Sequence, residues 1–253
     1  MASNDGSGAK EAPSVSDNSV AASRTAASAS FDVRVDGSLS EDAALSLLKR
    51  ADLAPEILEQ LSKIGELMKY RKVKLALVEH PRTPRHVSLP LIRQLYTFDL
   101  MQVALTPAVP TDVKRAADEA LVNRVETLAS GERLTLAHRG SGRIAEALLG
   151  DAETRVMQAA LQNSRLTEAS MVRALTRPSA TGAFVDAVAH HPQWSLRREV
   201  RVALLRNEKT PMARAVEFAH GLPPGLLREI LRTSHLSPKV KEYLLAEIGK
   251  RSG

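Results

Sequence analysis

The feature that most constrains this chain is a short unit, seen most clearly from Val73 onward, with the pattern of a helix, a turn and a second helix. Val73, Ala76 and Leu77 lie three and four residues apart, which places them on one helical face. A following proline ends that helix, because proline cannot donate a backbone hydrogen bond and disfavours helical geometry in the residue before it. Thr83 and Pro84 then predict the next helix, with the hydroxyl as its cap and the proline in its first turn.

The unit recurs along the chain, and each recurrence has a turn residue that marks it. Successive markers are 26, 31, 26, 44 and 27 residues apart, and three of these intervals are nearly equal. The 44-residue interval contains a degenerate unit, Phe184–Trp194. We therefore predict a stack of short helical pairs whose marker turns line up along one edge. The markers are Pro84, Pro110, Ser141, Thr167, Pro211 and Pro238.

The sequence divides into three parts. Residues 1–38 are rich in Ser, Ala and Gly and predict a disordered tail, either a plain linker or a docking segment, because they cannot bury enough apolar surface to offset the entropy of ordering. Residues 39–70 predict two N-terminal capping helices, the first capped by Ser40 and the second starting at Pro55. Residues 71–253 predict the helical repeat array.

Composition favours an all-α fold with an aliphatic interior. The chain has 4 Phe, 3 Tyr and 1 Trp, and only the run Phe31–Val35 alternates apolar and polar residues as a strand does. There is no cysteine, which excludes disulfides, thiolate metal ligands and cysteine nucleophiles and fits a reducing compartment. We find no secretory signal and no apolar run long enough to span a membrane, so we expect a cytoplasmic protein.

The turn motifs resemble those of the leucine-rich repeat variant family and, more loosely, the HEAT-like α-solenoids. The best matches are VKLALVEHPRTP at Val73–Pro84 and VRVALLRNEKTP at Val200–Pro211, and AALQNSRLT at Ala159–Thr167 is weaker. The resemblance covers roughly residues 70–250. It implies a right-handed α-solenoid, a curved array of stacked helical pairs that is used for macromolecular contact. It implies no shared catalytic residue.

The sequence lacks the patterns of catalytic and metal sites. The seven histidines include no HExxH pair, and no serine lies in a GxSxG elbow. His80 and His191 precede prolines in turns, which predicts bonds to local backbone. The triplet Gly140–Gly142 predicts a turn, with a weak anion site as the alternative, and Trp194 predicts packing between helical pairs. We therefore expect no catalytic residue, no metal and no cofactor.

Charge permits an acidic partner, whether a protein, a nucleic acid or an anionic lipid, and does not choose among them. The first 40 residues hold 3 Lys and Arg against 5 Asp and Glu, a net charge of −2, and the remainder holds 32 against 24, a net charge of +8. Arginine forks pair well with carboxylates and phosphates, although a solvated surface without a partner is the alternative. The candidate binding residues are Arg82, Arg85, Arg139, Arg143, Arg165, Arg197, Arg198, Arg201 and Lys209.

We favour a non-catalytic scaffold that presents an extended basic surface to an acidic protein partner. The alternative is binding of nucleic acid through its phosphates, although the few aromatics disfavour single-strand stacking. A HEAT-like DNA glycosylase ranks third. For packing and helix starts, we expect close helix contacts at Ala76, Ala159 and Ala203 and caps at Thr83, Thr210 and Ser237.

Overall fold

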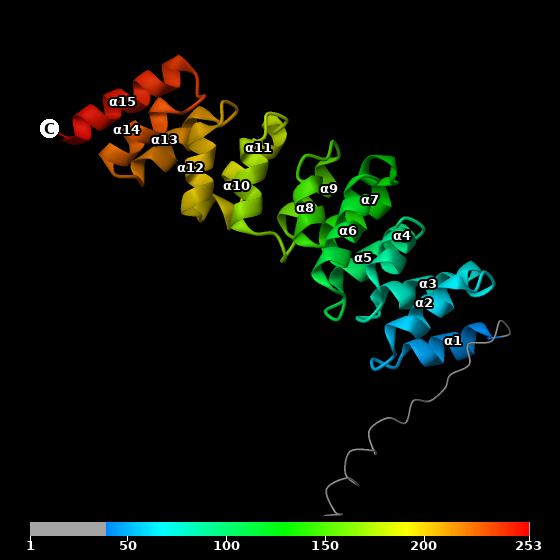
Figure 1. Cartoon of the computed structure of the whole chain (residues 1–253). Coiled ribbons are helices and arrows are strands. Elements are labelled where there is room, and N and C mark those ends of the chain that lie inside the picture. The colour runs from blue at the N-terminus through cyan, green and yellow to red at the C-terminus, as the bar shows by residue number, and fades with distance from the viewer. Residues whose placement is uncertain (1–38, 253) are drawn as a thin grey trace, which may run out of the picture. The chain divides into compact units, whose positions relative to one another are not determined.

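The computed structural model describes residues 39–252, which form α-helices and short 3-10 helices and contain no β-strand (Figure 1). The all-α prediction is confirmed for this part. The predicted tail, with its run Phe31–Val35, lies outside the described residues. The elements are α1 (Glu41–Leu48), α2 (Pro55–Lys63), η1 (Leu67–Lys69), α3 (Arg71–Glu79), α4 (Arg85–Ile92), α5 (Thr97–Leu105), α6 (Thr111–Val122), η2 (Val125–Thr127), α7 (Ser130–Arg139), α8 (Gly142–Leu148), α9 (Thr154–Leu161), α10 (Glu168–Thr176), α11 (Gly182–His190), η3 (Trp194–Leu196), α12 (Arg198–Arg206), α13 (Met212–His220), α14 (Pro224–Arg232) and α15 (Pro238–Ser252).

Short polar side chains and prolines set the starts of several helices. The Ser40 hydroxyl accepts a hydrogen bond from the Ala43 amide at 3.3 Å, so the predicted cap of α1 is confirmed. Pro55 occupies the first turn of α2, also as predicted. The hydroxyls that accept a backbone N–H bond at the starts of α8, α10 and α11 belong to Ser141, Thr167 and Thr181.

Thr83 and Thr210 do not cap the helices that follow them, so that prediction is wrong. The N-cap positions of α4 and α13 are the prolines after these threonines, and neither helix has a side-chain cap. Each threonine hydroxyl instead donates to a carbonyl six residues earlier, that of Leu77 or Leu204, at 2.6 Å. Those carbonyls lie in the last turn of the preceding helix, where i+4 helical partners run out, and that of Leu204 also accepts from the Asn207 backbone N–H at 3.0 Å. The cap predicted at Ser237 stays a prediction.

Alternate helices contact each other and form two rows. In one row, α4, α6, α8, α10, α12 and α14 each contact the next member (Figure 1). In the other, α1 contacts α3, α3 contacts α5, α7 contacts α9, α9 contacts α11, and α13 contacts α15. Contacts such as those of α3 with α4 and α7 with α8 join the rows. Each helix therefore buries its apolar side against its neighbours along the chain.

Buried or partly buried polar side chains join four of the turns to the turn two helices earlier. The Asn163 amide donates to the Ala137 carbonyl at 2.7 Å, and its Oδ1 accepts from the Arg165 backbone N–H at 2.8 Å. Backbone groups that would otherwise be unpaired are thus satisfied. Three other side chains bond in the same two directions. Each binds the carbonyl of an earlier turn and accepts from the backbone N–H of the residue two positions later; they are His80, Asn207 and Ser234.

The marker turns do not all lie along one edge, contrary to expectation. Turns after odd-numbered helices are bonded together, as where the Trp194 indole donates to the Leu161 carbonyl at 2.9 Å. Turns after even-numbered helices are bonded separately, as where Asn207 donates to the Leu175 carbonyl at 2.7 Å. The 44-residue interval holds three helices, α10, α11 and α12, and an odd number of antiparallel helices moves the next marker to the opposite end. Lys209 therefore lies at the opposite helix end from the predicted turn arginines Arg82, Arg85, Arg139, Arg143 and Arg165.

The core is aliphatic, as predicted. Among the described residues, the buried aromatics are Phe184, Trp194 and Phe218, and the rest of the apolar core is Leu, Val, Ile, Ala and Met. Trp194 is 9% exposed, which confirms its packing role. Ala159 and Ala203 are buried, as expected of close helix contacts, whereas Ala76 is only partly buried against the core.

Candidate functional site

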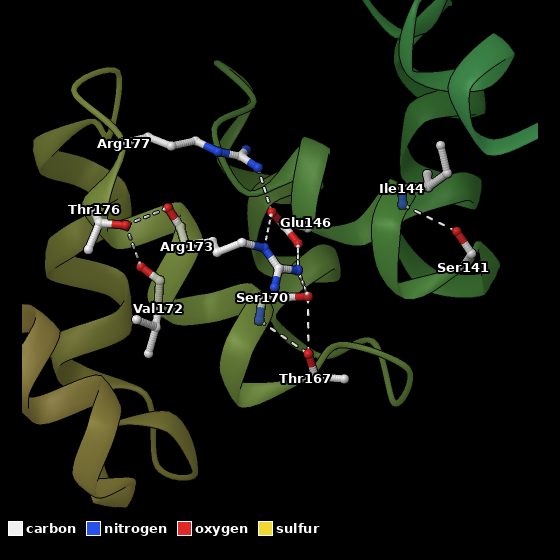
Figure 2. A network of polar contacts seen from close by, with 9 residues as sticks. All are labelled: Ser141, Ile144, Glu146, Thr167, Ser170, Val172, Arg173, Thr176 and Arg177. Carbon is white, nitrogen blue, oxygen red and sulfur yellow. Dashed lines mark hydrogen bonds and ion pairs between the residues drawn. The ribbon is translucent and has the colours of Figure 1, made fainter. Parts of the chain in front are cut away.

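A groove of about 730 Å³ between α8 and α10 is lined by four arginine side chains and one glutamate. Figure 2 shows the centre of this cluster, with Glu146 facing Arg173 and Arg177. We call it the arginine groove, defined by Arg143, Glu146, Arg165, Thr167, Ser170, Arg173 and Arg177.

Helical spacing brings these side chains onto facing surfaces. Arg143 and Glu146 lie three residues apart on α8. Ser170, Arg173 and Arg177 follow one another at spacings of three and four along α10 and its C-terminal end, so they share a face. The contact between α8 and α10 then places Glu146 opposite the two arginines of α10.

A close backbone contact fixes the turn that carries Arg165. Gly142 begins α8, and a Cβ atom at this position would lie 2.3 Å from the Arg165 carbonyl oxygen. The preceding Ser141 caps α8 and donates its hydroxyl proton to Asp118 Oδ1 at 2.6 Å. Burial raises the pKa of Asp118, and the hydrogen bond from Ser141 only partly opposes this rise. The glycine–serine–glycine triplet therefore forms a structural turn, which is the interpretation that the sequence analysis preferred to an anion site.

Glu146 is a buried anion at the centre of the groove, with a side chain only 7% exposed. Its Oε2 accepts a hydrogen bond from Arg173 Nη2 at 2.6 Å, and its Oε1 accepts one from Arg177 Nη2 at 2.5 Å. Desolvation is the largest influence and raises the pKa of Glu146. Hydrogen bonds from Arg173 and Ser170 and the charges of both arginines outweigh it, so the pKa lies below its usual range. Glu146 is therefore ionised at neutral pH.

Each arginine of the groove is partly exposed to solvent and also has a bonding partner within the fold. The side chains of Arg173 and Arg177 are 60% and 48% exposed although both bind Glu146. Arg143 pairs with Glu119 at 3.2 Å on the outer side, and Arg165 Nη1 lies 3.5 Å from a backbone carbonyl. Each guanidinium has five N–H donors, so each retains donors that face solvent.

The nine predicted binding residues fall into three groups, and only Arg143 and Arg165 meet in the groove. Four are used within the fold. Arg85 forms an ion pair with Asp112, while Arg82, Arg201 and Lys209 donate to backbone carbonyls of other turns or of their own turn. The remaining three, Arg139, Arg197 and Arg198, are exposed and have no side-chain hydrogen bond or ion pair within residues 39–252.

Sequence reasoning missed four members of the groove, namely Glu146, Ser170, Arg173 and Arg177, and took Thr167 only as a turn marker. It searched the turns, whereas these residues lie on the sides of helices or just after them. A signal was nevertheless present, because the two arginines are four residues apart and Glu146 precedes Arg173 by 27 residues, about one repeat. Opposite charges at repeat distance predict an ion pair between neighbouring units.

The histidines take the structural roles predicted for them. His80 accepts from the Arg82 backbone N–H through Nδ1, and His191 accepts from the N–H groups of Gln193 and Trp194. Burial lowers the pKa of His191. Within the part of the chain that the structure describes, no three His, Asp or Glu side chains are grouped so that they could hold a metal ion.

Comparisons with protein-family models, with curated proteins and with solved structures find no match for this chain. Within residues 39–252, no helix has the length and apolar character needed to cross a bilayer.

Proposed function

We propose that this chain is a non-catalytic binding scaffold that holds an acidic segment of a protein partner in the arginine groove. We further propose that residues 71–252 form an α-solenoid and that the protein acts in the cytoplasm. One observation carries the proposal, namely that a buried carboxylate holds two half-exposed arginines in a groove that two more arginines line. The two rows of helices support the solenoid, because in such an array each helical pair packs against its neighbours along the chain.

The chemistry of the groove favours an acidic ligand. Arginine makes two parallel N–H bonds to a carboxylate, and such charge-assisted bonds are among the strongest in proteins. Because Glu146 already fixes Arg173 and Arg177, a ligand loses less free energy in ordering these side chains than it would with free arginines.

A protein partner is favoured over nucleic acid because several of the other basic side chains are bonded within the fold. A nucleic-acid backbone is bound best by a line of free cations. Here Arg82, Arg201 and Lys209 instead donate to backbone carbonyls at 3.0, 2.6 and 2.6 Å, and Lys209 lies at the opposite helix end. No aromatic side chain lines the groove to stack on a base. Trp194 is buried and hydrogen-bonded, which disfavours a glycosylase that presses an aromatic against a base.

The test is capture of partners from native lysate after nuclease treatment, with a matched pair of variants. Arg173→Ala/Arg177→Ala removes two groove cations, and we expect it to lose the captured protein. Arg228→Ala/Arg232→Ala removes two exposed arginines with the same spacing on α14, and we expect it to keep that protein. Capture that disappears with nuclease, or that survives in the groove variant, would contradict the proposal.

A further inference from the structure

The unused donors of the arginine groove suit a multiply charged anion. Arg173 donates to Glu146 through Nε and Nη2, and its Nη1 has no acceptor among residues 39–252. Arg177 donates to Glu146 through Nη2 alone, so its Nε and Nη1 also have no acceptor among residues 39–252. These donors lie on half-exposed side chains, so an incoming ligand can reach them. The groove therefore offers several N–H groups from different side chains to one ligand.

The charge of the groove exceeds what one carboxylate can neutralise. Four guanidinium groups and one carboxylate line it, and Glu119 pairs with Arg143 from outside the lining, which leaves two formal positive charges. A carboxylate offers two oxygens and one negative charge. A phosphorylated side chain carries a charge of about −1.5 to −2 at neutral pH and offers three strong acceptor oxygens. It can therefore accept bonds from more than two guanidinium groups at once.

The role of Glu146 also fits this ligand. Glu146 is buried beneath Arg173 and Arg177 and holds one edge of each guanidinium, so the opposite edges are presented in fixed positions. Recognition sites are most effective when a supporting group holds the contacting side chains in place. Glu146 is thus a positioning residue that leaves the outer edges to the ligand.

The size of the groove indicates that the phosphate belongs to a larger ligand. Its volume of about 730 Å³ lies in the range of pockets that take whole ligands, roughly 300–1,000 Å³. Inorganic phosphate would fill only a small part of it. A peptide segment with its phosphate against the arginines would use both the charge and the remaining space.

From these contacts we infer that the arginine groove recognises a phosphorylated serine or threonine within the acidic segment of the partner. This inference rests on the proposed scaffold function and specifies its ligand. Arg173 and Arg177 contact the phosphate from the α10 side, and Arg143 and Arg165 face it from the α8 side and the intervening turn.

The experiment uses the full chain and fluorescence polarisation with three labelled mixtures of 11-residue peptides. The mixtures share randomised flanks and differ at the central residue, which is phosphoserine, serine or glutamate. We expect phosphoserine peptides to bind about tenfold more tightly than glutamate peptides, and inorganic phosphate to compete. Arg173→Lys and Arg177→Lys keep the charge, but an ammonium cannot hold Glu146 on one edge and present donors to a phosphate on the other, so each should weaken binding by about tenfold, while Arg228→Lys should not.

Circular dichroism checks that each variant is folded. Arg165→Lys is a second groove variant that leaves the Glu146 ion pairs intact, so a folding defect in the others does not block the test. Equal binding of glutamate and phosphoserine peptides, sensitive to Arg177→Lys, would overturn the phosphate inference and leave the acidic-segment scaffold standing. Failure of all three mixtures would also overturn it, and the nuclease-treated capture would then decide the scaffold alone. Tighter, strongly salt-dependent binding of a 12-base-pair duplex would overturn both.

Discussion

Replacing Asn163 by alanine tests whether buried turn side chains hold the repeats together. Asn163 is 4% exposed and donates to the carbonyls of Ala137 and Gly140 at 2.7 and 3.2 Å, while its oxygen accepts from the Arg165 N–H at 2.8 Å. Alanine keeps the backbone but removes all three bonds. The two short bonds each satisfy a backbone group that alanine would leave without its partner.

The magnitude follows from those two backbone groups. Each unsatisfied buried group costs about 1–3 kcal/mol, so we expect Asn163→Ala to lower the free energy of unfolding by about 2–4 kcal/mol, allowing for partial access of water. For a chain of this size that corresponds to a drop of about 4–16 °C in Tm.

The assay combines thermal unfolding with hydrogen exchange, because repeat arrays can unfold in segments and Tm alone would miss a local opening. We expect the Arg165 amide to lose protection in Asn163→Ala. The matched control is Gln162→Ala, which removes an exposed amide one residue earlier that makes no side-chain hydrogen bond within residues 39–252. Equal stability of the two variants, within about 0.5 kcal/mol, would refute the structural role of Asn163.

Three further changes probe the turns and the groove. Thr83→Val and Thr210→Val should each cost about 0.5–1.5 kcal/mol in urea unfolding, because the hydroxyl bond to the preceding helix is lost, and no change would show that these bonds contribute nothing. Gly142→Ala should cost about 1–3 kcal/mol, because its Cβ meets the Arg165 carbonyl, whereas Gly150→Ala meets no atom within 4 Å and serves as control. Equal losses in the two glycine variants would contradict the close approach. Burial lowers the pKa of His191 below 6.5, because the charged ring loses its hydration. The neutral ring therefore contributes stability above about pH 6.5, and this stability is lost as the pH falls through the pKa of His191 in the folded protein. His191→Asn can accept the same N–H bonds without titrating, so wild type should lose more stability than this variant between about pH 7 and pH 5, and parallel profiles would exclude the effect.

Much of the local structure could be predicted because its causes are local. Apolar residues at spacings of three and four, prolines and hydroxyl caps fix where helices form and begin, which is why Ser40 and Pro55 were correctly placed. Low aromatic content forces an aliphatic core. The histidine turns and the buried Trp194 were predictable for the same reason, since their roles depend on the turn beside them.

Other features depend on which helices become neighbours, and only the tertiary structure decided those. Thr83 was expected to cap the next helix, but its buried hydroxyl donates to the Leu77 carbonyl of the previous one. The marker turns separated onto two ends because one interval holds three helices instead of two. The arginine groove exists because α8 and α10 pack side by side, which brings Glu146 to arginines 27 and 31 residues away. A sequence specifies each helix through short-range propensity, whereas a site between helices is set by packing across a whole repeat.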